Sequence, residues 1–438
     1  MNENIGVIVH SSEAFVNVLF NIWANNDVAV LVDERIPHLS QICLLKMAGV
    51  KKCYLPKYED LEDNSDIEWI SYYRIEKSTH VLSKSIYEDF QQNYSNNDAV
   101  ILFSSGTTGN NKGIVLSHKA INLNADGIIK YLGLEENSVI GIIKSFAHSS
   151  ALIGELLVGV KTNKKIVILD SNKSMYSVLD DLYLHGVTHL FVNPSIMYLL
   201  IRTLENKKIS NKISLKKIYI SGSKASIHQI KKLKELLPEV SIMQAYGLTE
   251  LGPRVTAQVN DYPIGSVGKT IEGVDVKIVG NSGEELNIGE IGEIYVKSES
   301  VFTRYVTDVE HEKNTTDDGY FPTKDLGYIS ETKDIYIVGR KDNMINISSH
   351  NVYPESIEEF LINSGLISDC VVIGKENIGK GKYLVCYYVA SQNVNEELIK
   401  KCIFNLPIYE RPKKFFKVNQ LYYNNNGKVN RRKYEEVE

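Results

Sequence analysis

Short apolar runs rich in β-branched residues alternate, in the first half of the chain, with segments whose apolar residues recur at helical spacing. The runs VAVLV (28–32), AVILF (99–103), KIVILD (165–170) and HLFVN (189–193) are typical of buried strands. The segment 226–237 is typical of an amphipathic helix, which Pro238 would end. This alternation predicts an α/β architecture with strands between layers of helices.

Two changes of pattern follow. Residues 273–298 alternate apolar runs with the turns NSGE and IGEIGE, which predicts a β-rich antiparallel subdomain. After the charged turn GRKD (339–342), a helix at 354–361 precedes the strands DCVVIG (369–374) and YLVCYYVA (383–390). We therefore predict two domains. Residues 1–341 form a large N-terminal domain of stacked α/β subdomains plus the β-rich subdomain, and residues 342–438 form a small α+β C-terminal domain.

The composition is ordinary for a globular protein, with 43% hydrophobic and 24% charged residues among 438. The net charge of −5 gives no general attraction to nucleic acid or acidic membrane, so neither is expected as a partner. The five cysteines are widely spaced and form no C-x-x-C pair, which argues against a zinc or redox centre. The chain shows no signal-peptide pattern and no apolar run able to span a bilayer, so we expect a cytoplasmic protein.

A loop of small and hydroxyl residues follows the run at 99–103 and reads SSGTTGNNKG over residues 104–113. Glycines let backbone N–H groups approach phosphate oxygens, hydroxyls add donors, and Lys112 adds a positive charge. The loop lacks the spacing G-x-x-x-x-G-K-[ST] of kinases and GTPases, because Lys112 is followed by Gly113. The sequence thus predicts a phosphate-binding loop of another kind, for which a flexible turn is the simpler alternative.

The loop resembles the signature loop of the adenylate-forming superfamily of acyl- and aryl-CoA synthetases, peptide-synthetase adenylation domains and luciferase. Further segments resemble that family's motifs in the family's order, namely QAYGLTE (244–250), YFPTKD (320–325), residues 339–358 and NGKVNR (426–431). The resemblance covers nearly the whole chain. It implies that ATP activates a carboxylic acid as an acyl-adenylate with release of pyrophosphate, and that the acyl group then passes to a thiol.

The resemblance also implies roles in binding ATP and Mg²⁺. Tyr246 offers a flat face for adenine, Asp325 would accept hydrogen bonds from ribose, and Glu250 suits Mg²⁺. Taken alone, Tyr246 could equally be a core aromatic residue and Glu250 a solvated helix start. The residues assigned to ATP are Ser104, Ser105, Gly106, Thr107, Thr108, Gly109, Lys112, Gly222, Ser223, Ala245, Tyr246, Gly247, Asp325 and Arg340.

Three positions are assigned to catalysis and domain motion by the same resemblance. In the family, a mobile C-terminal domain brings a lysine to the α-phosphate, where its charge stabilises the reacting groups. That lysine corresponds to Lys428, while Thr249 would donate to the α-phosphate and Asp342 would be the hinge. By residue type alone, Lys428 could be merely solubilising and Asp342 a turn former.

The segment KSFAHSS (144–150) matches the place where acyl- and aryl-activating members carry an aromatic residue or histidine beside the acid. His148 is therefore a candidate catalytic residue, with a structural histidine as the alternative. The segment has no aspartate to hold an α-ammonium group, which disfavours an amino acid substrate. We expect a small carboxylic acid, aryl or aliphatic. Residues 151–154 and 193–198 are candidates for its pocket, although core packing explains them equally well.

The chain departs from the family pattern at several positions. Asn111 replaces the usual proline of the phosphate loop, and Lys324 replaces the glycine before Asp325. Ser349 stands where a glycine lines the thiol tunnel, which leaves the acceptor open between CoA and the phosphopantetheine of a carrier protein. From Ile5 onward the sequence resembles a point well inside the family's first subdomain, so we expect some peripheral structure to be missing.

Two alternative functions stay open. The first is an acyl-AMP ligase that loads only a carrier protein, and the second is a non-catalytic, nucleotide-binding relative. The retained Lys112, Glu250, Asp325 and Lys428 argue against the second alternative.

Overall fold

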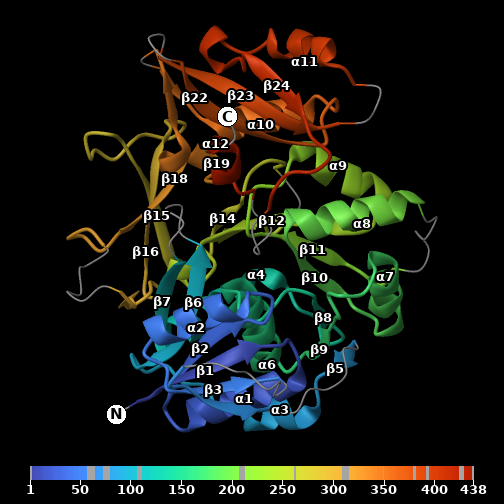
Figure 1. Cartoon of the computed structure of the whole chain (residues 1–438). Helices are drawn as coiled ribbons and strands as arrows, with labels where there is room; N and C mark the ends of the chain where they lie inside the picture. The colour runs from blue at the N-terminus through green and yellow to red at the C-terminus, as the bar shows by residue number, and fades with distance from the viewer. Residues whose placement is uncertain are drawn as a thin grey trace.

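The computed structural model of the chain describes residues 2–56, 65–72, 79–105, 111–206, 213–260, 263–307, 315–348, 350–377, 381–390, 394–423 and 429–436. Three sheets with their helices form a large N-terminal part, and a smaller C-terminal part, drawn in orange and red, lies above it (Figure 1). The predicted class is confirmed, with stacked α/β subdomains, a β-rich subdomain and a small α+β unit. The mobility of that unit stays a prediction.

The first sheet contains the N-terminal strands. Its core is parallel, since β1 pairs with β2 and β3, and β2 pairs with β6. In contrast, β7 folds back antiparallel to β6. The strands, in spatial order, are β17 (Arg304–Tyr305), β7 (Asn111–Ser117), β6 (Asp98–Ser105), β2 (Val28–Asp33), β1 (Asn4–Val9), β3 (Lys52–Leu55) and β4 (Glu68–Ser71). Helices α1 (Glu13–Ala24), α2 (His38–Met47) and α3 (Lys84–Asp89) belong to the same region.

The second sheet is parallel from β9 to β12. Its strands, in spatial order, are β14 (Lys269–Thr270), β13 (Thr256–Ala257), β12 (Ser241–Tyr246), β11 (Lys217–Ile220), β10 (His189–Val192), β8 (Val139–Ile142), β9 (Lys165–Ile168) and β5 (His80–Val81). Its helices are α7 (Met175–Leu184), α8 (Pro194–Asn206) and α9 (Ile227–Leu236). The last of these confirms the predicted helix, because the Ser226 hydroxyl caps its first turn and Pro238 follows its end.

A central layer of helices is buried in the large part. It consists of α4 (His118–Leu132), α5 (Ser149–Ala151), the π-helical turn η1 (Leu152–Leu157) and α6 (Val158–Lys161). One apolar cluster includes Val7 and Leu31 from the first sheet, Ile121 from α4, and Ile140 and Phe191 from the second sheet. Both sheets therefore share one core through these helices.

The β-rich subdomain is an antiparallel sheet, as predicted. Its strands are β15 (Val274–Val279), β16 (Gly292–Ser298), β18 (Phe321–Ile329) and β19 (Ile335–Arg340). The last strand leads directly into the short helix η4 (Lys341–Asn343) and so into the C-terminal part.

The C-terminal part has a core of its own, to which Val352, Ile357, Leu361 and Cys386 belong. Its elements are β20 (Ile345–Ile347), β21 (His350–Val352), α10 (Pro354–Asn363), β22 (Asp369–Asn377), β23 (Gly381–Val389), α11 (Glu396–Ile403), η5 (Ile408–Glu410), β24 (Lys414–Lys417) and α12 (Arg432–Glu435). The boundary between residues 341 and 342 stays a prediction. Within the described ranges, no helix is long and apolar enough to cross a membrane.

Candidate functional site

The parallel strands of the second sheet bring several of the predicted residues to one edge. Residues 144–150 follow β8, Asn193 follows β10, Gly222 and Ser223 follow β11, and Tyr246 ends β12. A Cβ atom on Gly222 would lie 3.9 Å from the Cβ of Asn193, so two of these loops are neighbours. Ligands of open α/β sheets bind at such carboxyl ends of strands.

The phosphate loop is carried by the hairpin of β6 and β7. Ser104 and Lys112 are partners in its register, so the two flanks of the loop lie side by side. The predicted residues Gly106, Thr107, Thr108 and Gly109 lie outside the described residues, as does the side chain of Ser105. Their contact with phosphate stays a prediction.

A tyrosine connects the phosphate loop with the predicted metal ligand. The Nζ atom of Lys112 lies 4.7 Å from the ring centroid of Tyr305, and the Tyr305 hydroxyl donates to Glu250 Oε1 at 3.2 Å. The Glu250 carbonyl also accepts from the Phe302 amide at 2.8 Å. The structure thus brings the cation of the loop close to the carboxylate through a residue that the sequence did not single out. In the described ranges, no group of three or more His, Cys, Asp or Glu residues could hold a metal ion.

Residues 144–150, the acid segment, meet residues 244–250, the phosphate segment, at two hydroxyls. Thr249 opens the short helix η3 (Thr249–Leu251), and its Oγ1 atom lies 3.1 Å from the hydroxyl of Ser149. His148 precedes α5, and its Nε2 atom lies 3.9 Å from Asp33 Oδ2. In contrast, Ala151, Leu152 and Ile153 are fully buried in the main core, which favours core packing for these three residues.

The residues expected to bind the nucleoside form a connected group. The Tyr246 hydroxyl donates to Asp325 Oδ2 at 2.7 Å, and Arg340 Nη1 lies 3.4 Å from Asp325 Oδ1. Asp325 and Arg340 are register partners on β18 and β19. Burial and the charge of Asp325 raise the pKa of Tyr246 well above its ordinary value, so the hydroxyl remains a donor at neutral pH. The structure places these three residues next to one another, and their binding of the nucleoside stays a prediction.

Gly247 lies where no side chain fits. A Cβ atom built on it would lie 1.9 Å from the Pro253 carbonyl oxygen, so the backbone after Tyr246 passes directly against the segment after Gly252. The glycine in the motif is therefore required by close approach of the backbone.

We expect Gly247→Ala to lower the free energy of unfolding by about 2–3 kcal/mol, since a backbone atom must move to admit the methyl group. A matched control is Gly154→Ala, whose added Cβ would meet its nearest atom at an ordinary 3.5 Å. The control should change stability by less than about 1 kcal/mol. Urea unfolding of both variants checks this expectation, and equal effects would contradict it.

The departure at Lys324 has a structural consequence. Lys324 has a φ of +62°, a left-handed conformation that glycine adopts without strain. Its Nζ atom lies 3.4 Å from both carboxylate oxygens of Asp342, the predicted hinge residue. The two side chains are 56% and 29% exposed, so the pair contributes little to stability. The hinge role of Asp342 stays a prediction.

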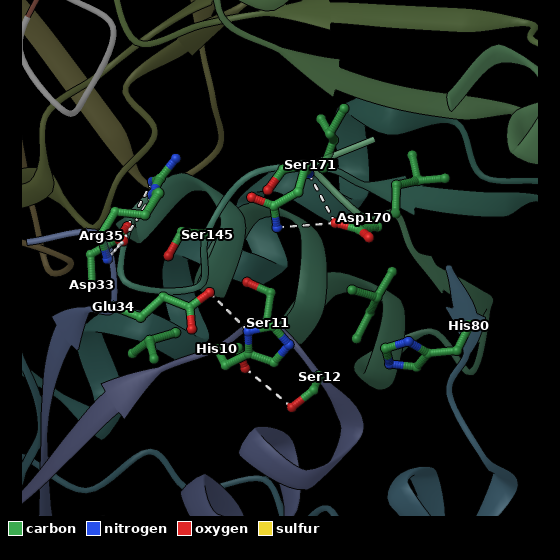
Figure 2. A pocket seen from close by; sticks show the side chains of 15 residues that line it. His10, Ser11, Ser12, Asp33, Glu34, Arg35, His80, Ser145, Asp170 and Ser171 are labelled. Carbon is green, nitrogen blue, oxygen red and sulfur yellow. Dashed lines mark hydrogen bonds and ion pairs between the residues drawn. The ribbon is translucent and has the colours of Figure 1, made fainter. Parts of the chain in front are cut away.

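A polar pocket lies beside the acid segment (Figure 2). Arg35 donates from Nε and Nη2 to the two oxygens of Asp33, at 2.8 and 2.7 Å, and His10 Nδ1 lies 2.8 Å from Glu34. Burial alone would raise the pKa of Asp33, but the hydrogen bonds and charge of Arg35 outweigh it and hold that pKa below its usual range. The lining includes none of the described residues expected to bind ATP, and Asp33 connects the pocket to His148.

The predicted catalytic lysine and tunnel residue, Lys428 and Ser349, lie outside the described residues. The C-terminal part nevertheless contacts the second sheet's helices. Lys224 Nζ lies 2.6 Å from Glu359 Oε2, and the His228 amide donates to Asn363 Oδ1 at 3.1 Å. Helix α10 therefore docks against the start of α9.

Two family models match the sequence in order. The model described as AMP-binding enzyme matches residues 2–306, and the model described as AMP-binding enzyme C-terminal domain matches residues 356–428. Among curated proteins, a probable CoA ligase of Humulus lupulus is 29% identical over 345 residues, which cover 76% of this chain and 62% of that protein. The 2-succinylbenzoate–CoA ligase of Staphylococcus epidermidis is 28% identical over 340 residues, which cover 76% of this chain and 69% of the ligase.

Solved structures show the same fold. The o-succinylbenzoate CoA synthetase of Bacillus subtilis, in complex with its acyl-adenylate intermediate, aligns with a TM-score of 0.84 at 22% identity, covering 100% of this chain and 88% of that one. ATP-bound MatB of Rhodopseudomonas palustris aligns with a TM-score of 0.86 at 20% identity, again over 100% and 88%.

Proposed function

The chain belongs to the AMP-binding enzyme family, and on that premise we propose that it activates a carboxylic acid with ATP and transfers the acyl group to a thiol. A carboxylate oxygen attacks the α-phosphorus, the bond to the β-phosphate breaks, and pyrophosphate leaves. A thiol then loses its proton and attacks the acyl carbon, and AMP leaves. The observation that carries the proposal is the contact at 3.1 Å between Ser149, in the acid segment, and Thr249, in the phosphate segment.

The roles proposed for the described residues follow from their contacts. Tyr246 would present its ring to adenine while its hydroxyl holds Asp325, which would accept hydrogen bonds from ribose. Glu250 would be the protein carboxylate on Mg²⁺, with ATP phosphates and water as the other ligands. Lys112, held over Tyr305, would add a positive charge close to that ion.

The acid is proposed to be a small aryl or aliphatic carboxylic acid. The curated relatives include ligases of 2-succinylbenzoate and of 4-coumarate, so aromatic acids are the first choice for a panel. Exchange of radioactive pyrophosphate into ATP should depend on one class of acid. If the wild-type protein binds ATP but none of the acids supports pyrophosphate exchange, the activation step is refuted and the non-catalytic alternative is favoured.

For the acceptor, we propose CoA, because the relatives named above are CoA ligases. The phosphopantetheine of an acyl or aryl carrier protein is the alternative. Thioester formation from the acyl-adenylate, measured once with CoA and once with a carrier protein that bears phosphopantetheine, distinguishes the two acceptors. A carrier-protein partner and a cytoplasmic location stay predictions.

Substitutions of Ser349 test the tunnel. If this residue lies against the pantetheine arm, Ser349→Leu should slow thioester formation about 100-fold and leave pyrophosphate exchange within about twofold. Ser349→Gly should leave exchange equally unaffected and speed the thiol step. The neighbouring Ser348→Ala is the control for a general effect on this hinge segment. If Ser349→Leu slowed both half-reactions equally, Ser349 would not line the tunnel.

A further inference from the structure

Three charged side chains to which no role has been assigned are buried behind the candidate site. Lys144 follows β8, Glu155 lies in η1, and Arg254 follows η3. Lys144 Nζ lies 2.6 Å from Glu155 Oε1, and these side chains are 7% and 0% exposed. Arg254 is the largest of the fully buried side chains. Because each buried ion loses several kcal/mol of hydration, such a cluster is a costly way to fill a core.

On the acid side, the cluster holds the start of a helix. Lys144 also donates to the Ser150 hydroxyl at 3.1 Å, directly after Ser149. Glu155 stands in the π-helical turn that continues this helix. A π-turn is rare and widens the helix at one point. Lys144 therefore holds the helix at two points directly after Ser149, the residue that reaches Thr249, through Ser150 and through Glu155.

On the phosphate side, Arg254 belongs to the segment that carries Thr249 and Glu250. Its backbone N–H donates to Asn124 Oδ1 at 3.0 Å, and its carbonyl accepts from Asn124 Nδ2 at 2.8 Å. Its guanidinium lies against η1, since a Cβ atom on Gly154 would meet Arg254 Nη2 at 3.5 Å. Among the described residues, neither Nε nor Nη2 of Arg254 has a hydrogen-bond partner. The guanidinium thus meets the helix of the acid segment through charge and packing, and it also opposes the burial that raises the pKa of Tyr131 on α4.

The charges depend on one another. Burial raises the pKa of Glu155 to about 7, although the positive charges of Lys144 and Arg254 oppose the rise. Burial likewise lowers the pKa of Lys144 against the effect of Glu155. Removing Glu155 would leave two buried cations without a counter-charge in a medium of low polarity, and removing Lys144 would take away the ion-pair partner of Glu155.

We propose that the Lys144–Glu155–Arg254 cluster positions Ser149 against Thr249, so that the acid and the α-phosphate meet in one geometry. This inference rests on the proposed function. Reacting atoms must come within about 3–3.5 Å, and a displacement of about 1 Å costs on the order of 100-fold in rate. The three residues are proposed to touch neither acid nor nucleotide. They are positioning residues for the adenylation step.

The test replaces the cluster by apolar side chains of similar volume, as Lys144→Met/Glu155→Met/Arg254→Met. Buried ion clusters replaced in this way often leave stability unchanged or increased. We expect kcat for pyrophosphate exchange to fall about 10- to 100-fold, with KM for ATP changed less than about threefold. The control is Lys161→Met/Asp126→Asn, which removes a 2.7 Å ion pair of a buried lysine between α6 and α4. The control should keep the wild-type kcat.

Hydrogen exchange gives a readout that does not depend on turnover. In the cluster variant, the amides of residues 149–152 and 249–252 should exchange about 10-fold faster than in the wild type, and those of the control should not. If the wild type shows no pyrophosphate exchange, the proposed function fails and this measurement alone decides the positioning role. Should the triple variant not fold, Ser150→Ala, which removes only the hydroxyl bound by Lys144, should lower kcat about threefold or more. Wild-type kcat, or unchanged protection of both segments, would overturn the inference.

Discussion

Replacing Lys428 with alanine is expected to lower acyl-adenylate formation about 100- to 1,000-fold, as the loss of a charge aimed at a transition state does in other enzymes. Thioester formation from supplied acyl-adenylate should survive. The reason is that the ammonium group would stabilise charge on the attacking carboxylate and the α-phosphate, and would take no part in the thiol step. Pyrophosphate exchange and single-turnover thioester formation measure the two steps separately.

The residues on either side of Lys428 support this role. Tyr423 and Val429 form a β-bridge, which brings the two flanks of the segment together. On the other flank, Arg431 makes two hydrogen bonds, at 2.6 and 2.7 Å, with the carboxylate of Glu358 on α10. The described residues on both flanks of Lys428 are therefore held, by the bridge between Tyr423 and Val429 and by the pair of Arg431 and Glu358.

A matched control lies in the same part of the chain. Lys433 is exposed and lies 4.9 Å from the ring centroid of Tyr422, so Lys433→Ala removes a positive charge without a predicted catalytic role. This variant should keep the rates of both half-reactions within about twofold of wild type and change the free energy of unfolding by less than about 1 kcal/mol. Near-normal pyrophosphate exchange by the Lys428→Ala variant would contradict the catalytic role of Lys428.

Much of the fold was predictable because strand and helix patterns are local. The run at 99–103 is found in β6, and the helix expected at 226–237 is α9. The glycine-rich alternation after Thr270 is found as the sheet of β15, β16, β18 and β19. In each case residues close together in the sequence carry both the preference for strand or helix and the signals for the turns between them.

The contacts that complete the site are not local. Tyr305 joins Lys112 to Glu250, which lies 55 residues earlier in the chain, and β17, where it stands, is only two residues long. The chain has 26 tyrosines, and nothing in the sequence around Tyr305 distinguishes it from the others. Its position depends on the pairing of β17 with β7, which a single sequence does not reveal.

Glu155 did leave a signal. It interrupts the apolar run ALIGELLVGV (151–160), and a lone charge in such a run predicts a buried group that needs a partner. Its partners could not be read in the same way. Lys144 lies in the preceding loop, and Arg254 comes from the segment after β12, far along the chain, which lies near the helix only through the arrangement of the second sheet.

Replacing Asp325 with alanine is expected to weaken the binding of AMP and of ATP alike, each by about 100-fold. Two hydrogen bonds from ribose hydroxyls to an ionised carboxylate contribute about 1.5–3 kcal/mol each, and part of that is recovered by water. The same change removes the acceptor of the Tyr246 hydroxyl and the partner of Arg340, so some loss of stability is expected as well. Affinity alone therefore does not separate ribose binding from a structural effect.

A comparison of AMP with 2′,3′-dideoxy-AMP separates them. The wild type should prefer AMP by about 100-fold, because the dideoxy nucleotide leaves the carboxylate without its donors. The Asp325 variant should bind both nucleotides with nearly equal, weak affinity. Tyr246→Phe is the matched control, since it removes the hydroxyl that donates to Asp325 and keeps the ring, and it should retain most of the preference for AMP. If the Asp325→Ala variant still preferred AMP, another residue would bind the ribose hydroxyls.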